Sequence, residues 1–325
     1  MAEQTTIIPI ASGKGGVGKS FLTANLSIAI AKLGFSTVVV DLDLGGSNLY
    51  TYLGMPNKHP GIGDYLKGKE VRFNGLLVRT KILNLKYIPG DGRTPFMANI
   101  SYAQRMTLLR DLKQIPARYI FLDLGSGSTF NTLNFFGLAH KGIIVTTLEI
   151  PSIMNFLAFL KNFMFYIILK AVSHNKEVLK ILITAFHQPI KSEPSSVKSL
   201  LDKISDIDRN LAIKAHNLCR NYRPRIIVNM GDRFDDLKIL RRIDDILKRK
   251  LSIEADYFGF IYYDDVVRKS VQNRETLFTR YPQSIASKSI KHVAGRINRI
   301  WDQPVEKSMV RLFEDTKRKH ALWKI

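Results

Sequence analysis

Short apolar runs recur along the chain and alternate with longer stretches in which apolar residues have helical spacing. Such runs are typical of strands that are buried on both faces of a sheet. They lie at residues 7–11, 36–40, 85–88, 119–122, 142–147, 225–228 and 257–261. Helical spacing at residues 21–33 ends at Gly34, a residue that commonly stops helices. The alternation predicts an α/β fold, a doubly wound and mostly parallel sheet with helices on both faces.

The longest apolar stretch is 153–172, which is rich in Phe and Tyr. Asn155, Lys161, Asn162 and Lys170 interrupt it. Because a membrane-spanning helix needs about 20 predominantly apolar residues, this segment is a weak candidate for one. A buried core helix explains the aromatic residues as well as a partner-binding surface does, and the sequence leaves both interpretations open.

Composition limits the classes of protein that fit. The 325 residues have 45% hydrophobic residues and a mean hydropathy of -0.05, which predicts a globular core. The net charge of +21 favours polyanions such as nucleic acid or anionic membrane, although a generally basic, solvated surface explains it equally well. The single cysteine, Cys219, excludes an internal disulfide framework, and residues 1–10 have no secretory signal pattern, so we expect a cytoplasmic protein.

A phosphate-binding loop follows the first predicted strand. Residues 13–20 fit the pattern G-x-x-x-x-G-K-[ST] and precede a predicted helix, which is the context that this motif requires. Glycines allow backbone N–H groups to surround a phosphate, and the helix N-terminus contributes its positive dipole end. We expect Lys19 to reach the β- and γ-phosphates and the Ser20 hydroxyl to bind Mg²⁺.

The loop contains a second lysine, Lys14, and resembles the deviant Walker A motif of the MinD/ParA family of ATPases. The resemblance covers most of 7–150 and 225–300. It implies that ATP and Mg²⁺ are the ligands and that Lys14 crosses to the nucleotide of a partner subunit, so that ATP binding produces a homodimer. The expected nucleotide contacts are Gly13, Lys14, Gly15, Gly16, Val17, Gly18, Lys19, Ser20, Phe21 and Asn229.

Carboxylates follow two of the predicted strands. By resemblance to the family, Asp43 positions the attacking water and contributes to Mg²⁺ binding together with Ser20 and Asp123, while Asp41 supports it. The catalytic set implied is Asp43, Lys14 and Lys19. Simple turn or helix-cap carboxylates are the alternative for the aspartates at 41 and 43. After Asp123 the chain departs from the family, because Leu124 stands where Ser or Thr is usual.

The base-binding end of the site is ambiguous from the sequence. Asn229 falls where the family has an Asn that contacts adenine, but Asp232 three residues later could accept from guanine. The resemblance favours ATP and leaves GTP as a minority interpretation. Residues 259–270 are similar to the closing segment of the flagellar-number regulators FlhG, also called FleN, with Tyr262 in place of their proline.

We expect one ATPase domain at 1–304, with a helical, basic insertion at 173–222, and an amphipathic tail at 305–325. Within the insertion, residues 197–219 have helical character after a Ser/Pro break at 191–196. The tail has apolar residues at near-helical spacing and several flanking cations, so it either grips anionic membrane at the inner face of the cell membrane or packs on its own domain. The leading hypothesis is a positional ATPase that governs flagellar number or placement, with a flagellar GTPase or a transcription regulator as partner. The alternatives are a ParA-type segregation ATPase that binds DNA nonspecifically and a scaffold that barely hydrolyses ATP.

Overall fold

The computed structural model describes residues 5–68, 72–90, 100–186 and 196–323. An eight-stranded sheet forms its centre in the order β3-β4-β2-β5-β1-β6-β7-β8. The strands are β1 Thr6–Ala11, β2 Thr37–Leu42, β3 Val78–Arg79, β4 Leu85–Ile88, β5 Tyr119–Leu124, β6 Ile143–Thr146, β7 Arg225–Gly231 and β8 Asp256–Tyr262. All pairs are parallel except β3 with β4, which confirms the predicted doubly wound sheet.

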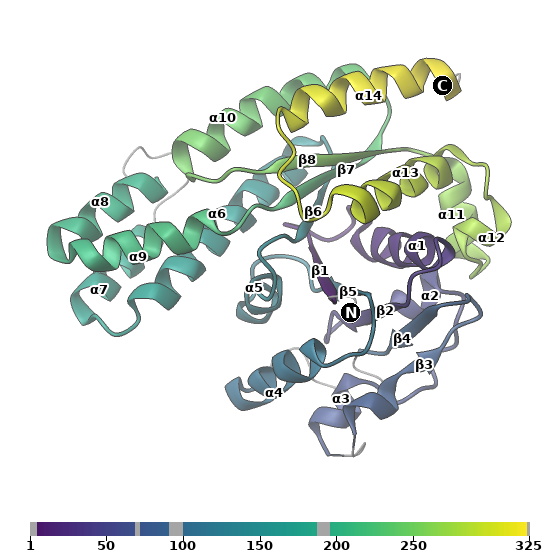
Figure 1. Ribbon diagram of the computed structural model, residues 1–325, viewed down its shortest axis with the longest axis horizontal. Helices are drawn as coiled ribbons and strands as arrows, with labels where there is room; N and C mark the ends of the chain where they lie inside the picture. Colours follow the sequence, from purple (N-terminus) through teal and green to yellow (C-terminus); the bar gives the residue numbers. More distant parts are fainter. Residues whose placement is uncertain (1–4, 69–71, 91–99, 187–195, 324–325) are drawn as a thin grey trace.

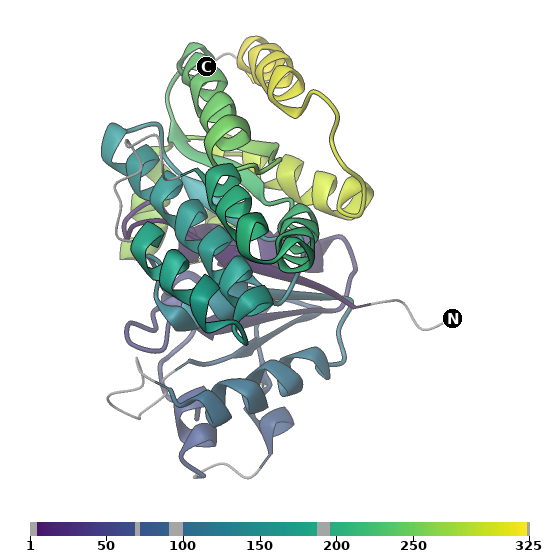
Figure 2. The ribbon, with the colours of Figure 1, turned by 90° about the vertical axis from the view of Figure 1, so that its left-hand side faces the viewer.

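Helices cover both faces of the sheet (Figures 1 and 2). They are α1 Lys19–Lys32, α2 Leu49–Tyr52, α3 Ile62–Leu66, α4 Tyr102–Lys113, α5 Phe130–Phe136, α6 Ile150–Val172, α7 Lys176–Phe186, α8 Val197–Ile207, α9 Arg209–Arg220, α10 Leu240–Lys250, α11 Asp265–Gln272, α12 Leu277–Arg280, α13 Ile285–Ile300 and α14 Ser308–Trp323. Short 3₁₀ turns lie at η1 Phe73–Leu76 and η3 Phe234–Ile239.

The strands divide their side chains between two apolar cores, as the two-residue period of a strand requires. In β2, Val38 and Val40 belong to the core that α4, α5, α6 and α14 cover, whereas Val39 faces α1 and α13. Both sets are buried, so the sheet is covered on both faces. This arrangement leaves the carboxyl ends of the parallel strands open at one edge, where open α/β sheets bind ligands.

Helix α6 belongs to the core. It is the one helix among the described residues that is long and apolar enough to cross a membrane, with a mean hydropathy of 1.6, and 72% of that window is buried inside the protein. Its aromatic side chains Phe159 and Phe163 both contact Phe136 of α5 edge-on. The aromatic stretch that the sequence left open is therefore largely core packing.

A helical extension formed by α7, α8 and α9 packs on the second half of α6 and projects away from the sheet (Figure 1, left). Its interior contains Val172, Val178, Leu200, Ile204 and Ala215, all buried. The Ser/Pro break that the sequence suggested at 191–196 lies mostly outside the described residues.

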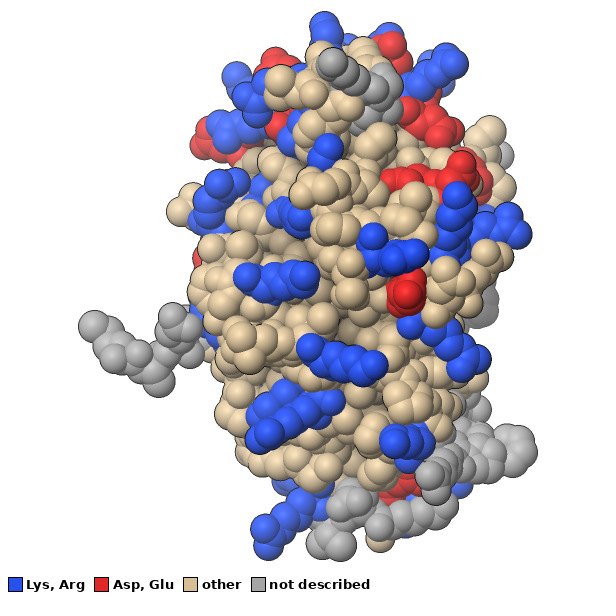
Figure 3. Space-filling model, turned by 90° about the vertical axis from the view of Figure 1, so that its right-hand side faces the viewer, with Lys and Arg blue, Asp and Glu red and all other residues tan. Residues whose placement is uncertain are grey.

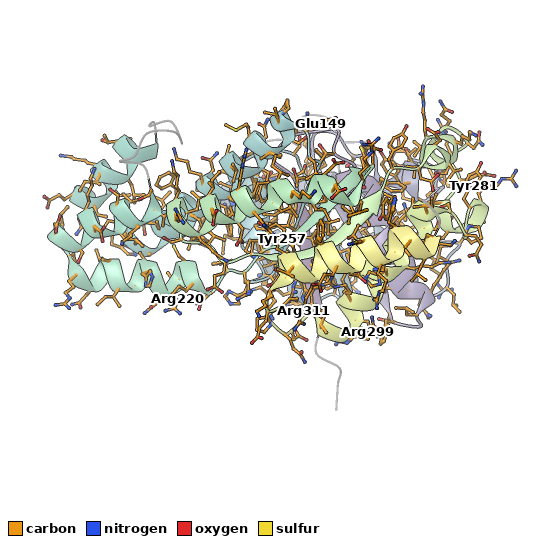
Figure 4. All side chains as sticks on the ribbon, turned by 90° about the horizontal axis from the view of Figure 1, so that it is seen from above. Glu149, Arg220, Tyr257, Tyr281, Arg299 and Arg311 are labelled. Atoms are coloured by element: carbon orange, nitrogen blue, oxygen red, sulfur yellow. The ribbon has the colours of Figure 1, made fainter. Side chains whose placement is uncertain are left out.

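The C-terminal helix α14 packs on β8. Leu312 and Thr316 are buried, and the Tyr262 hydroxyl of β8 donates to the Thr316 carbonyl at 3.1 Å. Tyr257 of β8 lies between α10 and α14 in the view from above (Figure 4). Its backbone N–H donates to Ser308 Oγ at 3.1 Å. Of the two interpretations of the tail, the structure therefore has its apolar stripe packed on its own domain.

Candidate nucleotide-binding site

The loops at the carboxyl ends of the strands border a cavity of about 580 Å³. Side chains from the loop after β1, from the end of β7 and from the region after β8 meet there. The lining includes Gly15, Gly16, Gly18, Lys19, Ser20, Phe21, Asp43, Ser126, Asn229, Met230, Tyr263, Arg268 and Gln272. Of the predicted nucleotide contacts, Gly13, Lys14 and Val17 do not line the cavity.

The loop before α1 has the backbone that its glycines permit. Gly16 and Gly18 both have φ of 84°, a left-handed conformation that residues with a Cβ adopt only at a cost. Gly13 lies directly against α6, because a Cβ added there would stand 2.2 Å from the Asn155 carbonyl oxygen. The loop is therefore wedged between α6 and β7, with its N–H groups and the N-terminus of α1 at the cavity.

Lys19 is buried and paired with a carboxylate. Its Nζ lies 2.9 Å from Asp123 Oδ1, 3.3 Å from Ser20 Oγ and 4.0 Å from Asp43 Oδ2. The Thr23 hydroxyl, one helical turn after Lys19, also donates to Asp123 Oδ1 at 3.0 Å. Sequence reasoning missed Thr23, although its spacing of four residues from Lys19 on α1 was the available signal.

The donor set fits a hard divalent cation. Asp123 Oδ2 is buried and accepts no hydrogen bond among the described residues, although a buried carboxylate oxygen normally has a partner. Ser20 and Asp43 supply further oxygens beside it, and Mg²⁺ prefers oxygen ligands. In the described part of the chain, no group of three or more His, Cys, Asp or Glu side chains could hold a metal by themselves. The set therefore suits an ion that a nucleotide also ligates.

Asp41 and Asp43 have different surroundings. Asp41 is fully buried and accepts from the N–H groups of Asp43 at 3.1 Å and Leu49 at 3.2 Å. Burial, and then the nearby Asp123 carboxylate, raises the pKa of Asp41 to about 8. Asp43 is partly exposed and lines the cavity. Asp41 thus shapes the turn that presents Asp43, and Asp43 is the one within reach of a ligand.

Lys14 lies at the rim of the site. Its side chain is 34% exposed, and its Nζ lies 3.8 Å from Glu149 Oε2 at the start of α6. Figure 4 places Glu149 on the opposite edge of the molecule from Arg299 and Arg311. Lys14 is therefore held by a weak, solvent-exposed ion pair.

Asn229 is tied to the phosphate-binding loop. Its Nδ2 donates to the Val17 carbonyl at 2.8 Å, and the side chain is buried against Gly18. The strand is irregular here, since the β7–β8 register shifts between Val228 and Gly231 and Met230 has φ of 55°. The bulge turns Asn229 toward the loop and Met230 toward the cavity.

The segment after β8 forms the far wall of the cavity. Asp264 accepts from the Val266 N–H at 3.2 Å and from the Ala286 N–H at 3.1 Å, so one carboxylate caps both α11 and α13. The fixed start of α11 places Arg268 and Gln272 in the lining. The sequence indicated this segment through its resemblance to a family, but the double cap required the fold.

Fold and loop together define a P-loop nucleotide-binding protein. The chain belongs to the CobQ/CobB/MinD/ParA nucleotide binding domain family, whose sequence profile matches residues 8–277. This membership confirms the resemblance seen in the loop.

Several curated proteins are similar to it. The antiactivator FleN of Pseudomonas aeruginosa is 25% identical over 92% of this chain and 88% of its own length. The flagellum site-determining protein YlxH of Helicobacter pylori is 26% identical over 90% of this chain and 81% of its own. The septum site-determining protein MinD of Thermotoga maritima is 34% identical, but only 49% of this chain and 59% of that protein align. The chain likewise spans about half the length of other MinD relatives.

Solved structures share the fold. MinD of Pyrococcus horikoshii OT3, complexed with Mg-ADP, has a TM-score of 0.59 at 18% identity, with 92% of this chain and 98% of that one covered. A ParA family ATPase of Chlorobium tepidum TLS has a TM-score of 0.58 at 19% identity, with 91% and 100% covered. At these identities the likeness concerns the fold alone.

Proposed function

We propose that the chain is a MinD/ParA-type ATPase that dimerises on binding Mg-ATP, separates after hydrolysis, and regulates flagellar number or placement in the cytoplasm. The observation that carries the ATPase part is the ion pair of Lys19 with Asp123 beside an unpartnered carboxylate oxygen, at the edge of a cavity of about 580 Å³. Flagellar regulation is supported by the names of FleN and YlxH, each aligned over most of the chain.

Each residue at the cavity has its own role in the proposed binding and hydrolysis of ATP. Lys19 would exchange Asp123 for the β- and γ-phosphates, and backbone N–H groups of 15–20 would surround them. Ser20, Asp43 and Asp123 would hold Mg²⁺, which neutralises phosphate charge when it is bound. Asp43, partly exposed at the cavity, would orient the attacking water and accept its proton.

Asn229 favours adenine over guanine. One of the two N–H groups on its Nδ2 donates to Val17, and we infer that its Oδ1 faces the base. An acceptor there suits the exocyclic amine of adenine and is unsuited to the O6 acceptor of guanine. Binding of ATP and GTP should therefore differ, and equal or tighter GTP binding would overturn the assignment and return attention to Asp232.

Dimerisation depends on Lys14 in this proposal. Lys14→Ala should keep ATP affinity close to that of the parent, because Lys19 and the loop N–H groups remain, but it should stay monomeric in ATP. Light scattering with ATP and ADP measures this, and Glu149→Ala is the matched control that removes the ion-pair partner while leaving the lysine. If the Lys14→Ala protein dimerises like the parent, the cross-subunit role of Lys14 is wrong. The alternative is then a simpler P-loop ATPase that works as a monomer.

The insertion at 173–222 and the tail at 305–325 are not needed for the proposed ATPase reaction itself. We treat 173–222 as an elaboration of one ATPase domain at 1–304. Membrane attachment through 305–325 would require α14 to leave β8 and uncover Leu312 and Thr316. Sedimentation with anionic liposomes that requires both ATP and residues 305–325 would support such a release, and sedimentation unchanged by deleting them would exclude it.

A DNA-segregation ATPase is the second candidate, and a basic face favours it. Lysines and arginines outnumber acidic residues around α11, α12 and the neighbouring parts of α1 and α13 (Figure 3). The exposed cations are Lys32, Arg268, Lys269, Arg274, Arg280 and Lys291. Retention on nonspecific duplex DNA in ATP, lost steeply as salt rises, would favour this function over the flagellar one.

A further inference from the structure

A strip of aromatic and cationic side chains crosses α4, α5 and α6, and none of its members lines the cavity. The Arg105 guanidinium carbon lies 5.5 Å from the Tyr102 ring centre and 5.4 Å from that of Phe130. The Phe130 ring then meets Tyr166 edge-on at 5.5 Å, and Lys170 Nζ lies 5.3 Å from the Tyr166 ring. Cations and rings thus alternate across three helices.

Large apolar groups of this strip are exposed. Tyr102 is 70% exposed, Phe130 54% and Met106, one turn after Tyr102 on α4, 46%. Tyr, Phe, Met and Arg are the residues enriched at the centres of protein–protein interfaces and depleted from ordinary surface. Exposed hydrophobic residues that are scattered singly need no explanation, but Tyr102, Met106 and Phe130 lie close together. Their grouping therefore indicates a surface for contact with a partner.

The exposed rings are held in place before any partner arrives. Arg105 is 8% exposed, donates from Nη1 to Asn131 Oδ1 at 3.0 Å, and sits between the two rings. Its Nε is buried and has no hydrogen-bond partner among the described residues. Since the rings pack on a fixed cation, contact with them costs little conformational entropy.

The charge around the strip selects the partner. Lys113 of α4 and Lys170 of α6 are both exposed, and they are close enough for the charge of Lys113 to act on Lys170. The acidic residue of α4, Asp111, is occupied by the Tyr65 hydroxyl at 2.7 Å and by Arg110. A positive rim around an aromatic centre is complementary to a ligand with apolar side chains and carboxylates.

We propose that Tyr102, Met106 and Phe130, together with Arg105, form a docking site for an acidic amphipathic segment of a partner protein. Its apolar side chains pack on the rings, and its carboxylates face Lys113 and Lys170. The site rests on the contacts of α4–α6 and not on the ATPase cycle proposed above.

The docking site adjoins the nucleotide loops. Phe130 is the first residue of α5, directly after the loop that follows Asp123. In that loop the Gly127 N–H donates to the Ser12 carbonyl at 2.9 Å, which joins it to the phosphate-binding loop. A partner seated on Phe130 is therefore next to the segment whose Ser126 lines the cavity.

The test uses a fluorescein-labelled 16-residue peptide with Leu and Phe on one helical face and Glu on the other, measured by anisotropy at low salt. We expect the intact protein to bind it, and Tyr102→Ala with Phe130→Ala to weaken binding by about tenfold or more, as loss of interface hot spots does. Ile213→Ala is the matched control, an exposed apolar residue of α9 outside the strip, and it should leave binding unchanged.

Charge is tested separately on exposed side chains. Lys113→Glu with Lys170→Glu should also weaken the peptide, and a peptide with Lys in place of every Glu should fail to bind the parent. All variants should retain the parent's ATP affinity, which separates this site from the nucleotide site. The proposal is overturned if the acidic peptide does not bind, if it binds the ring variants as tightly as the parent, or if both peptides bind alike.

Discussion

Replacing Gly13 by Ala tests how the phosphate-binding loop is held against α6. The added Cβ would stand 2.2 Å from the Asn155 oxygen, 2.3 Å from the Asn155 carbon and 2.6 Å from the Phe156 nitrogen. Carbon contacts are optimal at about 3.5–4.0 Å, so the loop and α6 must separate by more than about 1 Å. All three neighbours are backbone atoms of a buried helix, so no side chain can rotate away.

Overpacking of this kind costs about 1–3 kcal/mol, and we expect the upper half of that range. Urea unfolding of the nucleotide-free protein measures the loss, which should appear as a lower midpoint with an unchanged slope. Gly15→Ala is the matched control, because its nearest contact would be Ser126 Oγ at 3.8 Å, so its stability should change by less than about 0.5 kcal/mol. If Gly13→Ala unfolds at the same urea concentration as Gly15→Ala, the loop does not pack on α6 as described.

Three further variants probe other parts of the chain. Asp43→Ala should still bind ATP but turn it over about 10²-fold more slowly, and a normal rate in a phosphate-release assay would move the catalytic role elsewhere. Arg225→Met should lower the free energy of unfolding by about 1–3 kcal/mol, because it removes one of the two arginine partners of buried Asp256 and leaves three backbone carbonyls without their donor, whereas Arg223 still pairs with Asp256. Thermal and urea unfolding that both match the parent would contradict this. Burial acts to raise the pKa of Asp315, but the nearby His292 and a hydrogen bond from Lys319 of α14 hold it below its usual range. Its contribution to stability is therefore present above about pH 4 and lost as pH falls, so Asp315→Asn should be destabilised at pH 7 and should lose less stability on acidification.

The strands could be predicted from the sequence because both faces of the sheet are apolar. Residues 85–88 form β4 with the predicted bounds, whereas the two-residue β3 is too short to have a period. Residues 197–219 read as one helical stretch, but Asp208 divides it into α8 and α9 by accepting from the Leu211 N–H at 3.0 Å. Asp is a preferred N-cap residue, and Asp208 follows the apolar Ile207, so the sequence contained a signal for this cap. The continuous helical spacing of 197–219 nevertheless favoured a single helix.

Contacts between distant segments could not be predicted. The motif indicated the roles of Lys19 and Ser20, but not that Lys19 pairs with Asp123 or that Asn229 binds the loop carbonyl of Val17. Each contact joins residues more than a hundred positions apart, which only the strand order brings together. The tail illustrates the same limit, because an apolar stripe suits a membrane and β8 equally well until the partner surface is known.

If Mg²⁺ and a nucleotide bind as proposed above, the pairing of Lys19 with Asp123 has a consequence for the order in which they bind. A metal ion arriving alone meets a carboxylate whose charge a buried lysine already neutralises. A nucleotide arriving without metal draws Lys19 to its phosphates and leaves Asp123 as a buried charge without compensation, which costs several kcal/mol. The complex of metal and nucleotide supplies a new partner to both residues in a single event. In the proposed function, the pair would therefore favour binding of the two ligands together and oppose binding of each one alone.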